Sequence, residues 1–354
     1  MKTRHKLICG DSARSLGAIP AGSVSLVVTS PPYPMVEMWD ETFGAFNPRV
    51  KTALGKGDGT GAHEEMNRVL DLVWIAADRV ISPGGTICVN IGDATRTVNG
   101  SFRVYDNHTR VSVSLGKLGY SALPEILWRK PSNKPNKFMG SGMLPPGAYV
   151  TQEHEYILVF RKGLRKEFSP GERMNRRKSA FFWEERNLWF SDVWHDLHGE
   201  RQDSRGRGRS RSAAYPFELA YRLVNMFSVK GDVVLDPFAG TGTTALAAMA
   251  AGRDSLSVEV DPGFRDHAEA RILGAAELCN EYIRLRLKRH AEFAEGNKAL
   301  LYTNARHGFP VMTRQETELE LPLVDSVSKV DDEDFEVEYS QELLATKDIV
   351  RSAV

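Results

Sequence analysis

The sequence predicts an α/β fold with a largely parallel sheet, and two observations lead to that prediction. Short apolar runs rich in β-branched residues, such as Val24–Val28 and Val233–Leu235, alternate with segments whose apolar residues recur at helical spacing, such as His63–Ile81. The first of these runs stops at Ser30–Pro32, because prolines cannot donate to a sheet ladder. Repeated alternation of strands and helices is typical of a parallel sheet covered by helices.

The individual elements are expected in the following order. Lys6–Tyr33 reads as strand, helix and strand, and residues 34–62, rich in Gly, Asp and Thr, are expected to form a mobile loop. Further helices are expected at His63–Ile81, Val104–Leu118, Tyr215–Phe227, Thr243–Ala251 and from Pro262 to about Ala294. Further strands are expected at Thr86–Ile91, Ala122–Trp128, Glu155–Phe160, Val233–Leu235 and Ser255–Val258.

Length and composition fit a globular protein with a large core. The 354 residues are 42% hydrophobic and 26% charged, which allows one catalytic domain with inserted segments or two domains. No apolar run approaches the roughly 20 residues of a membrane helix. No apolar block follows the basic start at Met1–Lys6 either, so we expect a cytoplasmic protein without a membrane partner.

The three cysteines, Cys9, Cys88 and Cys279, lie far apart and form no Cys-x-x-Cys pair or Cys/His cluster. Neither a disulfide framework nor a metal site is therefore predicted. The thiols are expected to be small buried or half-buried side chains.

The net charge of zero hides an uneven distribution. Residues 315–354 carry twelve acidic and three basic side chains, whereas the remaining residues carry 43 basic and 34 acidic ones. A basic body with an acidic end fits a protein that binds a polyanion. The acidic end contains few core-forming clusters, so we expect it to be disordered or loosely docked.

A glycine-rich turn after the strand Val233–Leu235 predicts a ligand site. Gly240 and Gly242 let the backbone approach a ligand closely, and the next helix points its free N–H groups toward it. Glu259 follows the strand Ser255–Val258, where an acid can accept both hydroxyls of a ribose. The residues assigned to a cofactor are Asp236, Phe238, Gly240, Thr241, Gly242, Thr243, Thr244 and Glu259.

Three ligands could use such a turn. A P-loop needs a lysine after the glycines, and this chain has Gly242–Thr244 instead. A nicotinamide dinucleotide fits the Gly-x-Gly-x-x-Ala pattern that ends at Ala245, but Asp236 would lie beside its pyrophosphate. S-adenosylmethionine carries a ribose without a phosphate, and Asp236 suits its positively charged methionine end. A tight turn without any ligand is disfavoured by Asp236 before the glycines and Glu259 after them.

A Ser-Pro-Pro-Tyr tetrapeptide, Ser30–Tyr33, follows an early strand at the place where open α/β sheets bind ligands. The exocyclic amine of a base is a poor nucleophile, because its lone pair is delocalised into the ring. The Ser30 hydroxyl and the Pro31 carbonyl could accept its two N–H groups, and Pro31 and Pro32 keep the backbone rigid. Tyr33 offers an aromatic face on which a flipped base can stack. Alone the tetrapeptide reads as an ordinary proline turn; with the glycine turn it becomes a candidate catalytic motif.

Together these motifs resemble those of the amino-methylating DNA methyltransferases. Ser30–Tyr33 looks like their motif IV and Asp236–Thr244 like their motif I. The catalytic motif comes first in the chain, which resembles the circularly permuted β group and disfavours an RNA methyltransferase. Over roughly residues 5–290 the resemblance implies a Rossmann-like S-adenosylmethionine-dependent methyltransferase fold, with a mostly parallel sheet, permuted motif order and an inserted DNA-recognition region.

Further segments agree with this resemblance. Gly10–Ser12 looks like motif III, which implies that Asp11 contacts the cofactor's adenine. Ala214–Leu219 resembles the motif X helix, which implies contacts of Tyr215 near the methionine moiety. Ser82–Gly85 is similar to the turn before motif VI, and Glu153–Arg161 to the strand near motif VIII.

The resemblance implies methyl transfer to an exocyclic amine of a flipped base in duplex DNA. Serine rather than aspartate at position 30 resembles the N4-cytosine subset, and N6-adenine transfer is the alternative. Ring-carbon methylation fits poorly, because it requires a cysteine nucleophile after a proline and no cysteine here follows one. An alternative from another class is a DNA-binding protein with an inactive site.

DNA contacts are expected between residues 99 and 211. Arginines that alternate with glycine and polar residues indicate a flexible phosphate-binding loop, with a solvated surface loop as the alternative. The assigned DNA-binding residues are Lys130, Lys134, Lys137, Arg201, Arg205, Arg207, Arg209 and Arg211. Trp183, Trp189 and Trp194 are expected to be core residues rather than a stacking platform.

Four segments are expected. Residues 1–98 form the catalytic half, 99–211 the remaining strands with the target-recognition region, 212–295 the cofactor-binding half and 296–354 an acidic extension. The partners implied are double-stranded DNA and the cognate endonuclease of a restriction-modification system. A second copy of the chain is a further candidate partner.

Overall fold

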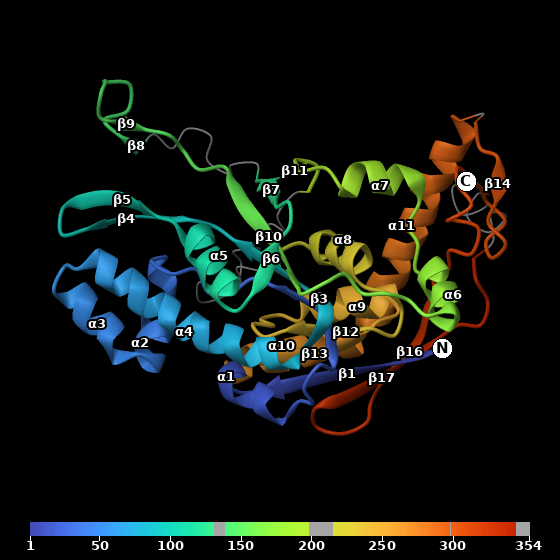
Figure 1. Ribbon diagram of the computed structural model, residues 1–354, viewed down its shortest axis with the longest axis horizontal. Coiled ribbons are helices and arrows are strands. Elements are labelled where there is room, and N and C mark those ends of the chain that lie inside the picture. Colours follow the sequence, from blue (N-terminus) through green and yellow to red (C-terminus); the bar gives the residue numbers. More distant parts are fainter. Residues whose placement is uncertain (131–138, 198–214, 298, 345–354) are drawn as a thin grey trace.

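The computed structural model describes residues 1–130, 139–197, 215–297 and 299–344, and its centre is one 11-stranded mixed sheet (Figure 1). Adjacent strands in the middle of the sheet run parallel. In spatial order they are β3 (Ile81–Ile91), β2 (Val24–Thr29), β12 (Val233–Asp236), β13 (Asp254–Glu259) and β1 (Lys2–Cys9). The α/β fold with a mostly parallel sheet is confirmed.

The strands that flank the parallel centre pair antiparallel with their neighbours, with one exception. Beyond β3 lie β10 (His154–Lys162) with β6 (Tyr120–Ala122), then β7 (Ile126–Arg129) and β11 (Val193–Trp194); beyond β1 lie β17 (Asp334–Tyr339) and β16 (Val324–Lys329). The exception is β11, which pairs parallel with β7. Three pairs of strands form two-stranded sheets outside the main sheet. They are β4 (Ala94–Val98) with β5 (Ser101–Tyr105), β8 (Met139–Gly140) with β9 (Ala148–Tyr149), and β14 (Tyr302–Thr303) with β15 (Pro310–Val311).

Helices cover both faces of the sheet (Figure 1). The α-helices are α1 (Ser12–Ser15), α2 (Asp40–Phe46), α3 (Pro48–Gly55), α4 (Gly59–Val80), α5 (Asn107–Lys117), α6 (Pro170–Lys178), α7 (Trp183–Trp189), α8 (Phe217–Phe227), α9 (Thr243–Ala251), α10 (Pro262–Leu273) and α11 (Ala275–Glu295). Short 3-10 helices are η1 (Leu16–Ala18) and η2 (Glu37–Trp39).

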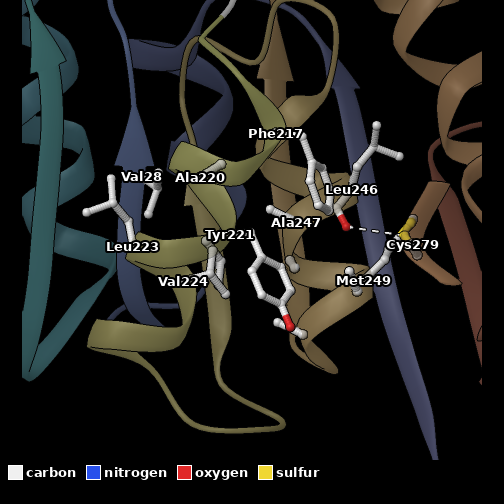
Figure 2. Close-up of a cluster of buried hydrophobic side chains, with 14 of the residues drawn as sticks. Val28, Phe217, Ala220, Tyr221, Leu223, Val224, Leu246, Ala247, Met249 and Cys279 are labelled. Carbon is white, nitrogen blue, oxygen red and sulfur yellow. Dashed lines mark hydrogen bonds between the residues drawn. The ribbon is translucent and has the colours of Figure 1, made fainter. Parts of the chain in front are cut away.

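Side chains of the central strands alternate between two apolar cores. Leu26 and Val28 of β2 belong to the core that also contains α8, α9 and α11, whereas Val27 belongs to the core built from α4 and α5. Figure 2 shows Val28 beside Leu223 and Val224 of α8. Burial of each large aliphatic side chain contributes roughly 1.5–3 kcal/mol, so these cores fix which strands become neighbours.

The carboxyl ends of the parallel strands meet at one edge of the sheet, which is where open α/β sheets bind ligands. The chain reaches this edge at Asp11 after β1, Ser30 after β2, Gly92 after β3, Asp236 at the end of β12 and Glu259 at the end of β13. The antiparallel strand β10 begins at the same edge, because Tyr156 pairs with Ile91. The sheet therefore gathers both sequence motifs and the start of β10 in one place.

The expected mobile loop at residues 34–62 is wrong, since this segment forms η2, α2, α3 and the start of α4. Side-chain caps begin two of the helices. Asn47 Oδ1 accepts a hydrogen bond from the Arg49 amide at 3.1 Å, and Asp58 Oδ1 accepts one from the Gly61 amide at 2.8 Å. The helices are too short to show a clear apolar period, and burial of Phe43 stabilises the segment.

Other element boundaries also differ from the expectation. Val104 lies in β5, because an unexpected β4–β5 hairpin precedes α5. The expected strand Ala122–Trp128 is divided into β6 and β7, and Pro124, which lies between them, cannot donate to a ladder. The expected long helix from Pro262 is divided into α10 and α11 at Gly274.

The acidic end is not loosely docked over residues 324–339. There β16 and β17 form an antiparallel pair, and β17 pairs with β1 at the edge of the main sheet. Phe335 and Val337 are buried, while Lys2 Nζ lies 2.7 Å from carboxylate oxygens of Glu336 and Glu338. The acidic side chains of β17 thus alternate with core side chains, which overall composition does not reveal. Residues 345–354 lie outside the described part.

Within the described ranges, no helix has the length and apolar character needed to cross a membrane. Cys88 and Cys279 are buried as expected, whereas Cys9 is exposed. Burial raises the pKa of the Cys279 thiol to about 12 and that of the Cys88 thiol well above its usual value. Both buried thiols therefore stay protonated at neutral pH.

The packing of the C-terminal hairpin predicts the effect of one substitution. Phe335→Ala should lower the free energy of unfolding by about 3–5 kcal/mol, because it empties a buried site between β17 and the core. Urea denaturation followed by circular dichroism measures the change, with Val330→Ala at an exposed turn position as the control. A near-zero effect of Phe335→Ala would mean that this hairpin is not part of the folded core.

Candidate active site

A cavity of about 810 Å³ opens at the carboxyl edge of the sheet. Both predicted motifs line it: Ser30–Tyr33 after β2 and residues 236–241 after β12. They meet because β2 and β12 are parallel neighbours in which Val27 pairs with Leu235. Asp11, Tyr215, Thr243 and Glu259 complete the predicted residues on the cavity wall. A volume of this order suits a small-molecule ligand.

Asp236 lies at the join between the two motifs and is only 2% exposed. Its Oδ1 accepts from the Thr29 hydroxyl at 2.6 Å and from the Phe238 amide at 3.1 Å. Its Oδ2 accepts from the hydroxyls of Thr244 at 2.7 Å and Tyr215 at 3.2 Å. Burial raises the pKa of this carboxyl, and the hydrogen bonds oppose that rise. Asp236 therefore ties β2, the segment before α8 and α9 together and places a buried carboxyl beside the cavity.

The glycine turn has the backbone conformation that its sequence requires. Gly240 and Gly242 have φ angles of 52° and 78°, in the region that favours glycine. Gly242 is the N-cap of α9, and a Cβ there would lie 3.2 Å from the Ala268 Cβ. Gly242 and Thr244 are not part of the cavity wall, unlike the other predicted residues of this turn. These two residues therefore affect the conformation of the turn without lining the cavity.

Glu259 closes the turn from the neighbouring strand. Its Oε2 accepts from the Gly240 amide at 2.7 Å, and its Oε1 accepts from the Asp261 amide at 2.9 Å. Burial raises the pKa of this carboxyl, and these backbone hydrogen bonds oppose the rise. Each oxygen keeps acceptor capacity toward the cavity, as a ligand with hydroxyl groups would need.

The structure brings two further predicted residues to the same cavity. Asp11 caps α1 by accepting from the Ala13 amide at 3.0 Å. The buried Tyr215 precedes α8, and its hydroxyl, which donates to Asp236 Oδ2, lies against the Thr244 hydroxyl. Both line the cavity together with the glycine turn.

An apolar wall of the cavity was missed by sequence reasoning. It comes from η2, α2 and α4 and includes Trp39, Phe43, Phe46, Val69 and Val73. Phe238 of the glycine turn packs against Trp74 of α4, with ring centroids 5.9 Å apart. The aromatic residues between Trp39 and Phe46 were the available signal, but the segment lacked a period long enough to place them.

A hydrogen-bond network behind Ser30 was also missed. The Tyr33 hydroxyl lies 3.2 Å from Ser30 Oγ and donates to Glu155 Oε2 at 2.9 Å. Asn90 Nδ2 donates to the Tyr33 hydroxyl at 2.9 Å and to Glu155 Oε2 at 2.7 Å. Lys130 Nζ donates to Glu155 Oε1. The sequence features that could have indicated this network are Asn90 inside the apolar strand β3 and Glu155 near the start of β10. Both residue types are common, so neither feature was distinctive.

Most of the predicted DNA-contact residues lie outside the described part of the chain: Lys134, Lys137, Arg201, Arg205, Arg207, Arg209 and Arg211. Lys130 is described; besides its ion pair with Glu155, its Nζ lies 4.4 Å from the centre of the Trp128 ring. Trp189 and Trp194 are buried core residues as expected, whereas Trp183 is 40% exposed.

No cluster of three or more His, Cys, Asp or Glu side chains suited to a metal ion occurs among the residues that the structure describes. The described wall of the cavity contains no cysteine. Its chemistry is that of carboxylates, hydroxyls, backbone groups, apolar side chains and the guanidinium groups of Arg14 and Arg79.

A parallel α/β sheet with a glycine turn and a shared cavity at its strand ends defines a Rossmann-like nucleotide-binding fold. Residues 24–270 match the N6/N4 methyltransferase family, described as DNA methylase. The chain belongs to this family and is a DNA amino-methyltransferase.

Individual relatives agree with this membership. The type II methyltransferase M.MthZI of Methanothermobacter thermautotrophicus is 49% identical over 344 residues, which is 96% of each chain. The type II methyltransferase M.MjaI of Methanocaldococcus jannaschii is 46% identical over 281 residues, covering 76% of this chain and 91% of the relative. The structure resembles that of TTHA0409 from Thermus thermophilus in complex with S-adenosyl-L-methionine, with a TM-score of 0.60 and 34% identity over 77% of this chain and 95% of that one.

The buried Asp236 predicts a pH-dependent difference in stability. Its folded-state pKa is raised by burial, so its contribution to stability is present at low pH and is lost as pH rises through that pKa. An asparagine does not titrate. The melting temperature of wild type should therefore fall relative to that of Asp236→Asn as pH rises from strongly acidic to neutral. Differential scanning fluorimetry across this range measures the trend, with the exposed Asp266→Asn as the control. A rise in the melting temperature of wild type relative to Asp236→Asn would contradict a raised folded-state pKa of Asp236.

Proposed function

We propose that the protein transfers a methyl group from S-adenosylmethionine to the N4 amine of a flipped cytosine in duplex DNA. One observation carries the proposal: Ser30–Tyr33 and the glycine turn line the same cavity, so a methyl donor and a base can face each other there. Membership of the DNA methylase family supports the DNA substrate and the amino group as acceptor.

The chemistry of the cavity wall fits S-adenosylmethionine. Glu259 offers free acceptor capacity to the ribose hydroxyls, and Phe238 with Phe264 offers apolar surface to the adenine. We assign Asp11 to the adenine and Tyr215 to the methionine end. Because four internal donors already enclose the Asp236 carboxylate, its role is to attract the positively charged methionine end by its field. The 34% identical TTHA0409, solved with this cofactor, supports the assignment.

The remaining residues of the glycine turn have two different roles in this proposal. Gly240, Thr241 and Thr243 lie on the cavity wall and approach the cofactor directly. Gly242 and Thr244 do not line the cavity. Gly242 allows the backbone conformation of the turn, and Thr244 donates a hydrogen bond to Asp236. Loss of either group should weaken cofactor binding, the first through direct contacts and the second through the shape of the turn.

The tetrapeptide positions the target base. Ser30 Oγ and the Pro31 carbonyl accept the two N–H groups of the amine, Pro32 stiffens the turn, and the Tyr33 ring stacks on the base. The sulfonium of the cofactor would supply an already activated methyl group: its S–C bond breaks as the N–C bond forms, S-adenosylhomocysteine leaves as a neutral thioether, and the methylated amine gives up one proton to water. The residues of the chain therefore contribute proximity and electrostatic placement rather than a strong general base.

The choice of cytosine N4 rests on the uncharged serine at position 30, with N6-adenine transfer as the alternative. An inactive DNA-binding protein is disfavoured, because Ser30, Asp236 and Glu259 are all present and line one cavity. We further propose that the motif order is circularly permuted. In this proposal residues 1–98 and 212–295 are the catalytic and cofactor-binding halves, 99–211 carries the DNA-recognition region, and 296–354 is the extension.

DNA contacts in this proposal come from Lys130 and from the lysines and arginines outside the described part that the sequence singled out. The name type II methyltransferase of two relatives supports a restriction-modification setting and a cognate endonuclease. A homodimer remains a candidate assembly.

Nucleoside analysis tests the base assignment. Purified protein is incubated with labelled S-adenosylmethionine and amplified, unmethylated DNA, which is then digested to nucleosides and separated. We expect the label in N4-methylcytosine, because Ser30 presents a neutral acceptor. Recovery of N6-methyladenine alone would overturn the cytosine assignment, and no labelled nucleoside would favour the inactive DNA-binding protein.

Ser30→Ala tests the placement of the amine. It should lower kcat by about 100- to 1000-fold, as expected for loss of one oriented hydrogen-bond partner in a transition state. Cofactor affinity, measured by calorimetry, should change little, since Ser30 lies at the base end of the cavity. Equal losses of kcat and cofactor affinity would contradict this placement.

A further inference from the structure

Glu155 accepts a hydrogen bond from Tyr33 of the tetrapeptide but does not line the cavity. Its side chain is 13% exposed. Oε2 accepts from Tyr33 and Asn90, and Oε1 pairs with the Lys130 ammonium. A carboxylate enclosed in this way acts on the reaction through its neighbours rather than by touching the base.

The proposed reaction makes a demand on the Ser30 hydroxyl. A hydroxyl can donate as well as accept, and its proton rotates to suit its neighbours. The target amine must offer its N–H groups to Ser30 and keep its lone pair for the methyl group. Ser30 is therefore useful only when its own proton points away from the base.

The network behind Ser30 fixes that direction. The carboxylate of Glu155, paired with Lys130, can only accept, so the single hydroxyl proton of Tyr33 goes to Glu155 over 2.9 Å. The Tyr33 oxygen is then an acceptor, to which Asn90 Nδ2 donates at 2.9 Å and Ser30 Oγ donates at 3.2 Å. The lone pairs of Ser30 are left facing the amine, apart from a long contact of 3.4 Å with Asn90 Nδ2.

Two features support this series of hydrogen bonds from Ser30 through Tyr33 to Glu155. Burial, and after it the charge of Glu155, raise the pKa of Tyr33 well above its usual value, so Tyr33 keeps the proton that it donates. Gly92 allows the close approach, because a Cβ there would lie 3.0 Å from Tyr33 Cε2 and 3.2 Å from Glu155 Cγ.

We propose that Glu155 is a positioning residue which, through Tyr33, orients the Ser30 hydroxyl so that its oxygen accepts from the target amine. The inference rests on the proposed function. It gives Tyr33 a second task besides stacking, because the phenol oxygen transmits the effect of a carboxylate to an uncharged serine.

Glu155→Gln tests the inference, because its amide can donate to the Tyr33 oxygen and reverse the chain. We expect kcat to fall about 10- to 100-fold, the range for losing a hydrogen bond to a charged group, with cofactor affinity nearly unchanged. Tyr33→Phe keeps the stacking ring and should show a similar fall. The double variant should be no slower than the slower single variant, since both changes break the same chain.

Glu153→Gln is the matched control, since Glu153 is close in sequence, more exposed and paired with Arg129. Its kcat should equal that of wild type. A wild-type kcat in Glu155→Gln, or falls that multiply in the double variant, would overturn the inference. If Glu155→Gln does not fold, as judged by melting, Tyr33→Phe decides: an unchanged kcat overturns the inference and a selective fall in kcat supports it.

Ser30→Ala separates this inference from the proposed function. If Ser30→Ala is inactive while Glu155→Gln and Tyr33→Phe are fully active, Ser30 keeps its role and the orienting chain is wrong. If Ser30→Ala itself has a wild-type kcat, the placement of the amine at Ser30 fails, and the inference fails with it.

Discussion

The parallel pairing of β2 with β12 is the constraint on which the site depends. It places Ser30 and Asp236 at adjacent strand ends, and the Thr29 hydroxyl bonds Asp236 across the two strands at 2.6 Å. Two motifs far apart in the chain thereby share one cavity wall. The apolar cores on both faces hold this pairing, because Leu26 and Val28 pack toward α8 and α9 while Val27 packs toward α4.

Buried and half-buried carboxylates gather at this edge, and each is held by several donors. Asp236 accepts from four groups, Glu259 from two backbone amides, and Glu155 from Tyr33 and Asn90 beside its ion pair with Lys130. Removing such charges from water is costly unless hydrogen bonds replace the lost solvation. Several carboxylates that are removed from water at one edge of a sheet are typical of a functional site, because a hydrophobic core would be more stable without them.

Elements outside the two motifs decide the shape of the site. The helices between residues 37 and 80 supply its apolar wall, and β10 brings Glu155 to the edge by running antiparallel to β3. At the far side, β17 covers the edge of β1 and buries Phe335. The shape of this edge is thus set in part by segments outside the two motifs.

The sequence by itself determined the α/β class, the central strands, the glycine turn and twelve of the residues that line the cavity. These follow from local properties: prolines come directly after the end of β2, glycines permit the φ angles of the turn, and an acid is the last residue of each of the strands β12 and β13. The order of strands, the apolar wall and the Ser30–Tyr33–Glu155 chain were decided only by the tertiary structure. They depend on contacts between distant segments, such as Asn90 with Glu155, and such contacts leave no period or spacing in the sequence. For the same reason the acidic end read as loose, although half of its β17 side chains face a core.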